Sequence, residues 1–391
     1  MTLPRSPLEA PAVRPFEGLV VVELGHSVAA PFAAHILSEL GARVVKIEKQ
    51  EGDDARQWGP PFWEGASALF QALNRNKASV VCNFRDPAHV EAVKAFIQVE
   101  ADVVLQNLRP GQVEKLGIDG PRLCADKPSL IYCNLGAFGS EGPLKDRPGY
   151  DPLMQAFGGI MSTTGEEGRP AVRVGASIVD MGTGLWAMIG ILTALYERQK
   201  TGVGRLVDVS LFETATSWVS LLASQYLASG QVAQKQGSGA TGIAPYKAYA
   251  TQDGEIVVAA GSDGLFKRLA NALGHPEWLE DPRFVDNPSR VQHQAALYNM
   301  LDALLLTQDT QTWVACFEDA GIPCSAVQNI AQMVAHPQTQ ALKLIQEVPG
   351  TGMRFFGLPL RFDGQRPQSL SAPPKLGEHQ HLIFKTGETK V

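Results

Sequence analysis

Five short apolar runs, regularly spaced along the first 138 residues, constrain this chain more than any other feature. They read GLVVVELG, ARVVKIEK, ASVVCNF, ADVVLQNL and SLIYCNLGAF, at residues 18–25, 42–49, 78–84, 101–108 and 129–138. Strands that are apolar on both faces are typical of parallel sheets covered by helices on each side. The runs therefore predict the strands of one buried parallel sheet.

The segments between these runs are predicted to be helices, which completes a strand–helix alternation. HSVAAPFAAHILSELG follows the first run, with Pro31 suited to a first helical turn, and DPAHVEAVKAFIQV begins with Asp and Pro. This alternation predicts an α/β fold with a doubly wound, Rossmann-like sheet. The first strand ends in LGHSVAAP rather than GxGxxG, which disfavours simple NAD binding.

Composition excludes several classes of protein. The net charge of −6 and the spread of the 34 basic residues argue against a nucleic-acid partner. We expect no membrane association, because no apolar run approaches about 18–20 residues and the Pro-rich N-terminus is not a signal peptide. The five cysteines form no metal-ligand spacing, and burial as free thiols in a reducing cytoplasm is expected.

The 391-residue length predicts two domains. The texture changes near residue 205, where GRLVDVSLFETATSWVSLLASQYLASG reads as a strand and then a long helix. We assign residues 1–205 to a large domain, 206–225 to a linker helix, 226–330 to a small mixed α/β domain, and 331–391 to a return to the large domain. The Pro- and Gly-rich tail is too loose to form its own core.

Asp180 is the lone acid in VRVGASIVDMGTGLWAMIGIL, at a junction between β-type residues and a helical pattern. One interpretation is an N-cap, for which Asp is favoured. The other is a nucleophile, with the small residues Gly182 and Gly184 leaving space beside it and helix N–H groups holding negative charge. The aliphatic stripe that follows is expected to be core (Leu185, Met188 and Leu192).

Several phrases together resemble the family III CoA-transferases across the whole chain. They are VVELGHSVAAPFAAHILSELGARVVKIEKQEGDDAR, LNRNKASVVCNF, LQNLRPGQVEKLG, GYDPLMQAFGGIMSTTG, VDMGTG and the closing PPKLGEHQ. The segment GIAPYKAYATQDGEIVVAAG is most similar to the subgroup that moves CoA between dicarboxylic acids. The resemblance implies a Rossmann-like large domain built from both chain ends, a smaller mixed α/β domain, and an interlocked, ring-like homodimer.

The resemblance also implies that Asp180 is the catalytic aspartate. Its carboxylate attacks a thioester carbonyl and becomes a mixed anhydride, and CoA thiolate then attacks the aspartyl carbonyl to give an enzyme thioester. An acceptor carboxylate reverses the sequence. Because acyl activation is kept throughout, coenzyme A enters as acyl-CoA substrate, and neither ATP nor metal is required.

Two positions distinguish branches of the family. In the 2-methylacyl-CoA racemase branch a His–Asp pair stands where this chain has Tyr150 and Asp151, and Tyr is a poor base for α-proton exchange. Asp151 either orients the site or caps the helix that follows it. In the formyl-CoA branch a glutamine stands where this chain has Val28, which disfavours formyl-CoA and oxalate as substrates.

The remaining candidates contact substrate or CoA. His26 follows the first strand at the edge where open α/β sheets bind ligands, although a structural histidine is equally consistent with the sequence. Gly237 and Gly239 lie in a loop able to close over an intermediate, or in an ordinary turn. Candidates for CoA binding are basic residues and one amide (Lys49, Arg75, Lys77, Asn107, Arg109 and Lys115). Arg56 and Arg173 are guesses for a second substrate carboxylate.

The sequence thus predicts a cytoplasmic CoA-transferase that uses Asp180. The expected donor is a dicarboxylyl-CoA such as succinyl-CoA, and the expected acceptor is a short dicarboxylate of the itaconate, mesaconate, malate or glutarate type. A 2-methylacyl-CoA racemase or epimerase is the alternative.

Overall fold

A computed structural model describes residues 13–384. These residues divide into two compact units, one comprising residues 13–160, 174–224 and 340–384, and the other residues 161–173 and 225–339. The second unit therefore takes in a short excursion at 161–173 that the sequence did not indicate. It also extends to residue 339 rather than 330.

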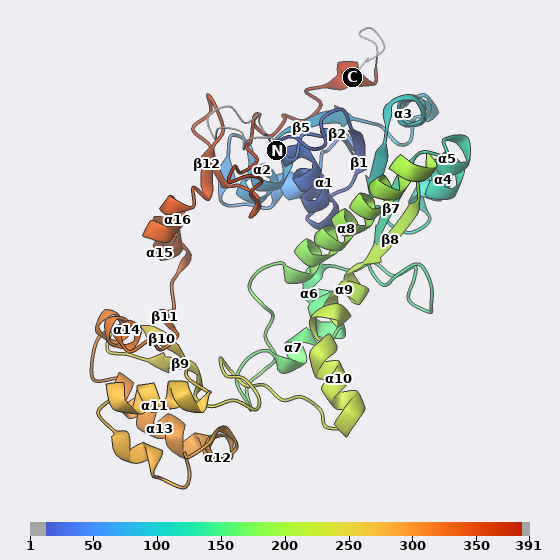
Figure 1. Ribbon diagram of the computed structural model, residues 1–391. Helices are drawn as coiled ribbons and strands as arrows, with labels where there is room; N and C mark the ends of the chain where they lie inside the picture. Colours follow the sequence, from blue (N-terminus) through green and yellow to red (C-terminus); the bar gives the residue numbers. More distant parts are fainter. Residues whose placement is uncertain (1–12, 385–391) are drawn as a thin grey trace, which may run out of the picture. The chain divides into compact units, whose positions relative to one another are not determined.

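The first unit is built on a six-stranded sheet whose neighbours are all parallel (Figure 1). The strand order is β5-β2-β1-β6-β7-β8, which is the 3-2-1-4-5-6 order of a Rossmann fold. The strands are β1 (Val20–Leu24), β2 (Arg43–Glu48), β5 (Lys77–Val81), β6 (Val103–Gln106), β7 (Ile131–Gly136) and β8 (Leu206–Ser210). The five apolar runs are thus confirmed as strands of one sheet.

Helices cover both faces of the sheet, as the uniformly apolar strands predict. On one face α1 (Ala29–Glu39) and α8 (Ile178–Thr201) pack against alternate strand residues, including Val21, Val103 and Cys133. On the other face lie α3 (Pro87–Glu100), α4 (Gln112–Leu116) and α5 (Gly120–Asp126), and Figure 1 shows these two sets on opposite sides. The first unit also contains α2 (Ala68–Asn74), α6 (Asp151–Phe157), α9 (Leu211–Trp218) and two small hairpins, β3 (Phe62–Trp63) with β4 (Ala66–Ser67) and β12 (Ile345–Glu347) with β13 (Arg354–Phe356). Helix α7 (Ile160–Thr163) lies where the chain passes into residues 161–173 of the second unit.

Residues 206–225 are not a linker helix. Residues 206–210 form β8, the edge strand of the sheet, and the helical part is split into α9 and α10 (Ser220–Ser229). The strand reading of this segment was right. The single long helix was wrong, because the helix is interrupted at Val219.

The C-terminal tail packs on the larger sheet, as its loose composition predicts. It runs beside β5, the other edge strand, and Gln380 uses its side-chain amide to bond both the N–H and the carbonyl of Val81. His379 accepts a hydrogen bond from the N–H of Ser79 and returns its own N–H to the carbonyl of that residue. The tail thereby occupies backbone groups that an exposed edge strand would leave unpaired.

The second unit has a three-stranded antiparallel sheet in the order β11-β10-β9. A hairpin of β9 (Tyr246–Ala250) and β10 (Glu255–Ala259) is extended by β11 (Cys324–Ala326). With α11 (Asp263–Ala272), α13 (Gln294–Leu305) and α14 (Thr310–Asp319), which enclose an apolar core, this sheet confirms the mixed α/β character predicted for the small domain. Shorter helices complete this part (α12, Asn287–Gln292; α15, Ile330–Ala335; α16, Pro337–Ala341).

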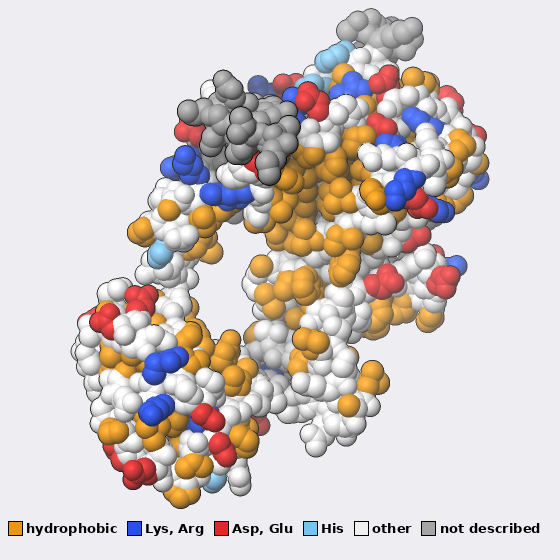
Figure 2. All heavy atoms as spheres, viewed as in Figure 1, with side chains coloured by type: hydrophobic (Ala, Val, Ile, Leu, Met, Phe, Trp, Pro, Cys, Tyr) orange, Lys and Arg blue, Asp and Glu red, His pale blue; other side chains and the backbone are white. Residues whose placement is uncertain are grey.

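Helix α8 is long and apolar enough to cross a membrane by length and composition, contrary to our estimate of the apolar runs. Core helices of soluble proteins pass the same test, and half of this segment is buried against the fold. Of the stripe predicted as core, Met188 is buried, but Leu185 and Leu192 are 46% and 42% exposed. Figure 2 shows hydrophobic side chains gathered on this part of the first unit.

All five cysteines are free thiols, and Cys82 and Cys133 are buried as expected. Burial raises the pKa of the Cys82 thiol to about 12. Among residues 13–384, no cluster of three or more His, Cys, Asp or Glu side chains is arranged to hold a metal ion.

Candidate active site

The sheet reverses its strand order between β1 and β6, and open α/β folds bind ligands at the carboxyl ends of strands at such a point. The loops that leave these two strands are bonded to each other. The His26 N–H donates to Asn107 Oδ1 over 2.9 Å, and Asn107 Nδ2 donates to the His26 carbonyl over 2.9 Å. The sequence places both residues at this edge, and the structure brings them together.

A buried ionic network supports the turn from β1 to α1. Lys46 Nζ lies 2.8 Å from Glu23 Oε1 and 2.9 Å from Asp53 Oδ2, and it donates to the Gly25 carbonyl over 2.7 Å. Lys77 Nζ lies 2.8 Å from the other oxygen of Glu23. Since isolated buried charges are costly, this arrangement of two cations and two anions holds because each charge has a partner.

Asp180 lies in the first turn of α8, at the same edge of the sheet. Helix α8 connects two parallel strands, β7 and β8, so it runs antiparallel to them and begins near their carboxyl ends. It packs closely on α1: a Cβ added at Gly184 would lie 2.9 Å from the Ala29 carbonyl oxygen. Asp180 therefore lies one turn of α8 before the residue that meets the start of α1. Its side chain is only partly buried.

Asp151 caps α8, although it lies in the first turn of α6. Its Oδ2 accepts hydrogen bonds from the N–H groups of Val179, at 2.8 Å, and Asp180, at 3.1 Å. Its Oδ1 accepts from Gln155 Nε2 at 2.6 Å, and Gln155 Oε1 accepts from the Val174 N–H at 2.8 Å. Asp151 and Gln155 are both buried, so this chain of bonds holds the approach to Asp180 in one geometry.

The pKa of Asp180 is raised from 3.8 to about 7. The larger cause is burial, which disfavours the carboxylate, and the second is the nearby negative charge of Asp151. At neutral pH the side chain is therefore poised between carboxylic acid and carboxylate. Perturbed pKa values of this kind cluster at functional sites.

The structure overturns three local interpretations around Asp180. The residue is not the N-cap, a position held by Ser177. The glycines that follow it serve helix packing: Gly184 faces α1, and a Cβ at Gly182 would lie 2.9 Å from Thr214 Cγ2. The first N–H groups of α8 are already bonded and do not face a ligand, since Asp151 takes two of them.

Two of the proposed CoA ligands are structural. Lys77 is fully enclosed, and besides Glu23 it donates to the Pro31 carbonyl and to Asn74 Oδ1. Arg75 is buried: its Nε lies 3.1 Å from Glu39 Oε1 and also donates to Ser369 Oγ, and its two terminal nitrogens each donate to a main-chain carbonyl. Their prediction as CoA ligands is corrected, because both side chains are enclosed and paired with carboxylates inside the fold.

Arg56 is likewise excluded as a partner for a second substrate carboxylate. It forms a two-pronged ion pair with Glu48, at 2.7 and 2.8 Å, and also donates to the Pro374 carbonyl. Arg173 lies in the second unit and already takes part in an interaction.

Three basic candidates remain on the surface. Lys49 is half exposed and lies 2.6 Å from Asp54 Oδ1, in a pair that solvent screens. Arg109 and Lys115 are exposed beyond the carboxyl end of β6. Asn107 is at the predicted place, but its amide ties the two loops together.

The other candidate positions differ in environment. Val28 is buried as the N-cap residue of α1, and Tyr150, which precedes α6, is exposed. Gly237 adopts a left-handed φ of +59°, and its N–H donates to the Gly165 carbonyl. Gly237 and Gly239 belong to the second unit, whereas Asp180 belongs to the first.

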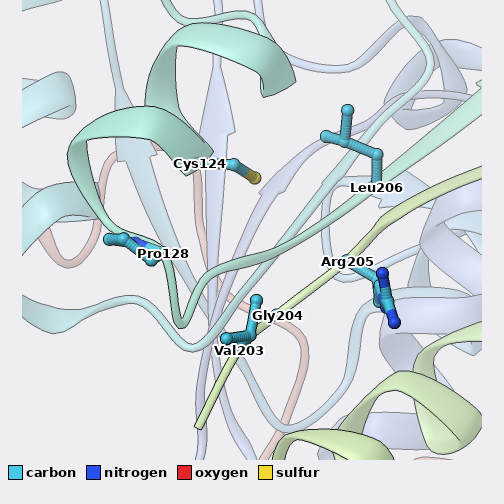
Figure 3. Close-up of a pocket in the computed structure, with 6 residues that line it drawn as sticks. All are labelled: Cys124, Pro128, Val203, Gly204, Arg205 and Leu206. Carbon is cyan, nitrogen blue, oxygen red and sulfur yellow. The ribbon is translucent and has the colours of Figure 1, made fainter. Parts of the chain in front are cut away.

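A pocket lies at the amino ends of the strands of the large sheet, where β8 begins (Figure 3). It is lined by Cys124, Pro128, Val203, Gly204, Arg205 and Leu206. Arg205 is ion-paired with Glu197. Because the pocket is at the amino ends of the strands, it is separate from the site around Asp180.

Sequence reasoning missed the residues that support this site: Lys46, Asp53, Gln155 and Ser27. A weak signal was present, since Lys46 and Glu48 are charged residues inside an otherwise apolar strand. A charge in a strand buried on both faces requires a partner. The partner's identity depends on strand order, which the sequence does not state.

Comparisons with known proteins agree with this arrangement. The family model of CoA-transferase family III matches residues 16–380. The human succinyl-CoA:glutarate CoA-transferase is 33% identical over 377 residues, covering 95% of this chain and 86% of the relative. The acetyl-CoA:oxalate CoA-transferase of Acetobacter aceti is 35% identical over 374 residues, covering 95% of each chain.

A crystal structure of a CAIB/BAIF family protein from Brucella suis superposes with a TM-score of 0.86 and 38% sequence identity. It covers 94% of this chain and 98% of that one. The family match spans nearly the whole chain and includes the edge of the sheet at which Asp180 lies. The protein is therefore a CoA-transferase and belongs to family III of these enzymes.

Proposed function

We propose that the enzyme transfers CoA from a dicarboxylyl-CoA, such as succinyl-CoA, to a short dicarboxylate, with Asp180 as nucleophile. An Asp180 oxygen bonds to the thioester carbonyl carbon, the C–S bond breaks, and CoA leaves as thiolate, leaving a mixed anhydride. The thiolate then attacks the aspartyl carbonyl and releases the free acid. The acceptor carboxylate attacks the aspartyl-CoA thioester, and thiolate attack on the new anhydride yields the product and restores Asp180.

The observation that carries this proposal is the setting of Asp180. Its carboxyl group is partly accessible, lies at the ligand-binding edge of the sheet, and has a pKa of about 7. Raising the pKa of a carboxylate raises its basicity and hence its reactivity toward a carbonyl carbon, while a useful fraction stays ionised at neutral pH. Asp151 contributes both the fixed geometry and part of that shift.

The substrates are proposed from the relatives and from the candidate cations that lie at the surface. The names of the two relatives described above pair an acyl-CoA with a dicarboxylic acid, glutarate or oxalate. Lys49, Arg109 and Lys115 are proposed to hold the phosphates of CoA, with phosphate replacing Asp54 as the partner of Lys49. Val28 still argues for an acceptor other than oxalate.

Racemisation is the alternative, and the relatives do not favour it. Proton exchange next to a thioester requires a paired acid and base. Tyr150 stands where the racemase branch has histidine, and the buried Asp151 carboxylate is occupied with three hydrogen bonds.

We also propose a cytoplasmic homodimer. Support comes from an apolar stripe on α8 that remains exposed in one copy and recurs every three or four residues (Met181, Leu185, Ile189, Leu192 and Tyr196). Large exposed apolar surfaces of this kind mark interaction sites. Ile189→Lys is expected to shift the sedimentation velocity from dimer toward monomer. An unchanged sedimentation profile would contradict a dimer contact through this stripe.

The transferase proposal is tested by exchange and trapping. Wild type and Asp180→Ala receive succinyl-CoA with carbon-labelled succinate, and then unlabelled glutarate, mesaconate, itaconate, malate or oxalate. Label should enter succinyl-CoA with wild type alone, and hydroxylamine should convert Asp180 to its hydroxamate, detected by peptide mass spectrometry. Exchange by Asp180→Ala would refute the nucleophile. Deuterium uptake into 2-methylacyl-CoA without CoA exchange would favour the racemase.

A further inference from the structure

The chemistry at Asp180 requires a hydrogen-bond donor that helix α8 does not provide. As the carboxylate attacks, negative charge develops on the thioester carbonyl oxygen and must be stabilised. The N–H of Ile178 donates to the Ala176 carbonyl, and that of Met181 to the Ser177 carbonyl. The two N–H groups between them donate to Asp151. The donor must come from a neighbouring element.

Helix α1 packs on the first turns of α8, and a Cβ at Gly184 would lie 2.9 Å from the carbonyl oxygen of Ala29, the first residue of α1. The turn from β1 into α1 immediately precedes this contact, and hydrogen bonds fix the backbone of that turn. The Gly25 carbonyl is bonded to Lys46, both main-chain groups of His26 to Asn107, and the Ser27 N–H to Asp53 Oδ1 at 3.1 Å. Ser27 has a left-handed φ of +69°, a conformation that a serine keeps only where its surroundings enforce it.

The His26 side chain is the polar group of this turn with a ring nitrogen still available. Nδ1 lies 2.9 Å from Ser27 Oγ, and the ring is only partly buried. Burial lowers the pKa of His26; the negative charge of Asp53 opposes this shift and the positive charge of Lys46 adds to it, and the net lowering leaves the neutral ring predominant at pH 7. When the Ser27 hydroxyl donates to Nδ1, the ring proton resides on Nε2.

We propose that His26 is a further catalytic residue, which donates a hydrogen bond from Nε2–H to the thioester carbonyl oxygen during attack by Asp180. This rests on the proposed function. The C=O π electrons move onto oxygen as the Asp180 oxygen–carbon bond forms. They return as the C–S bond breaks, and His26 keeps its proton throughout. Lys46, Asp53 and Asn107 are positioning residues that fix the backbone of the turn carrying His26, and Ser27 Oγ contacts its ring.

A costly ionic network lies beside this turn. Glu23, Lys46 and Lys77 have side chains with no solvent exposure, and removal of such charges from water is unfavourable unless each has a partner. Lys46 donates a hydrogen bond to the Gly25 carbonyl and Lys77 donates one to the Pro31 carbonyl, so the network binds the backbone before and after His26. Donors fixed in advance do not need to reorganise when charge develops.

The kinetic test compares His26→Ala with His26→Gln, whose amide keeps an N–H donor. His26→Ala should lower kcat by about 10²–10³-fold with little change in KM, and His26→Gln should recover about tenfold of that loss. His275→Ala is the matched control, because His275 is partly buried beside Glu277 and Trp278 in the second unit, outside the proposed site, and it should retain full activity. Circular dichroism verifies that each variant is folded.

A second measurement needs no turnover. Long-range proton–nitrogen NMR of the histidine-labelled wild type, with the His26 signal assigned by its loss in His26→Gln, should show Nε2 protonated and Nδ1 bare at neutral pH. A kcat for His26→Ala within about threefold of wild type, a loss confined to KM, or a proton on Nδ1 would each overturn the proposal. If wild type exchanges no label with any acid, the proposed function fails instead, and the NMR result separates the two failures.

Discussion

Replacement of Asp180 by Asn should stabilise the enzyme, and the gain should grow with pH. The pKa of Asp180 is about 7 in the folded state and 3.8 without its surroundings, so the folded state binds more protons between these values. Wild-type stability therefore falls as pH rises through this window, and the penalty is complete above pH 7. At about 1.36 kcal/mol per pKa unit, the ceiling is roughly 4 kcal/mol.

Solvent screening reduces that ceiling, because the carboxyl group is only partly buried. We expect Asp180→Asn to raise the free energy of unfolding by about 1–2 kcal/mol at about pH 8. About 1 kcal/mol of this increase should be lost at about pH 5. Urea unfolding of both proteins across this range, followed by tryptophan fluorescence, measures the difference. A gain that is equal at both ends of the range would show that Asp180 does not titrate there, and the argument would fail.

Asp151→Asn is the matched control. An Asn side chain keeps one oxygen to accept from the Val179 and Asp180 N–H groups but removes the negative charge. The pKa of Asp180 should then fall below 7 without reaching 3.8, because burial is the larger cause and remains. When Asp180→Asn is made in the Asp151→Asn protein, its increase in the free energy of unfolding should therefore develop at lower pH. If the midpoint of this pH dependence does not move, Asp151 is not a cause of the raised pKa of Asp180.

Three further predictions follow from named contacts. The kcat/KM for acyl-CoA should rise with pH to a plateau above about pH 7, because the nucleophile must be ionised; a pH-rate profile that is flat between about pH 5 and 8 would contradict this. Gly184→Ala should lower the free energy of unfolding, measured by thermal unfolding, by about 1–3 kcal/mol, because its Cβ would lie 2.9 Å from the Ala29 carbonyl oxygen. Gly264→Ala in α11 has open space around its Cβ and should raise the free energy of unfolding by about 0.5–1 kcal/mol. Lys49→Ala should raise the KM for acyl-CoA severalfold at constant kcat, whereas Arg75→Ala should cost about 3–5 kcal/mol of stability by stranding Glu39; equal stability of these two variants would refute the division between surface and structural cations.

The sequence alone determined the parts of this protein that depend on local pattern. Uniformly apolar strands alternating with helices are legible within windows of a few residues, and they predicted a covered parallel sheet whose carboxyl edge holds the site. The place of Asp180 at the start of a helix was legible in the same way. The family resemblance then extended this reading to chemistry, and the family match over residues 16–380 confirms the family.

Only the tertiary structure decided which charges are available. Arg75 and Lys49 look alike in sequence, yet Arg75 meets Glu39 and Ser369, residues 36 and 294 positions away, whereas Lys49 faces solvent. Asp151 likewise caps α8, 28 residues later in the chain, rather than the helix it begins. Such pairings arise when strand order and helix packing bring distant side chains into one low-dielectric region. No local propensity encodes them, because the interaction energy exists only after the chain has folded.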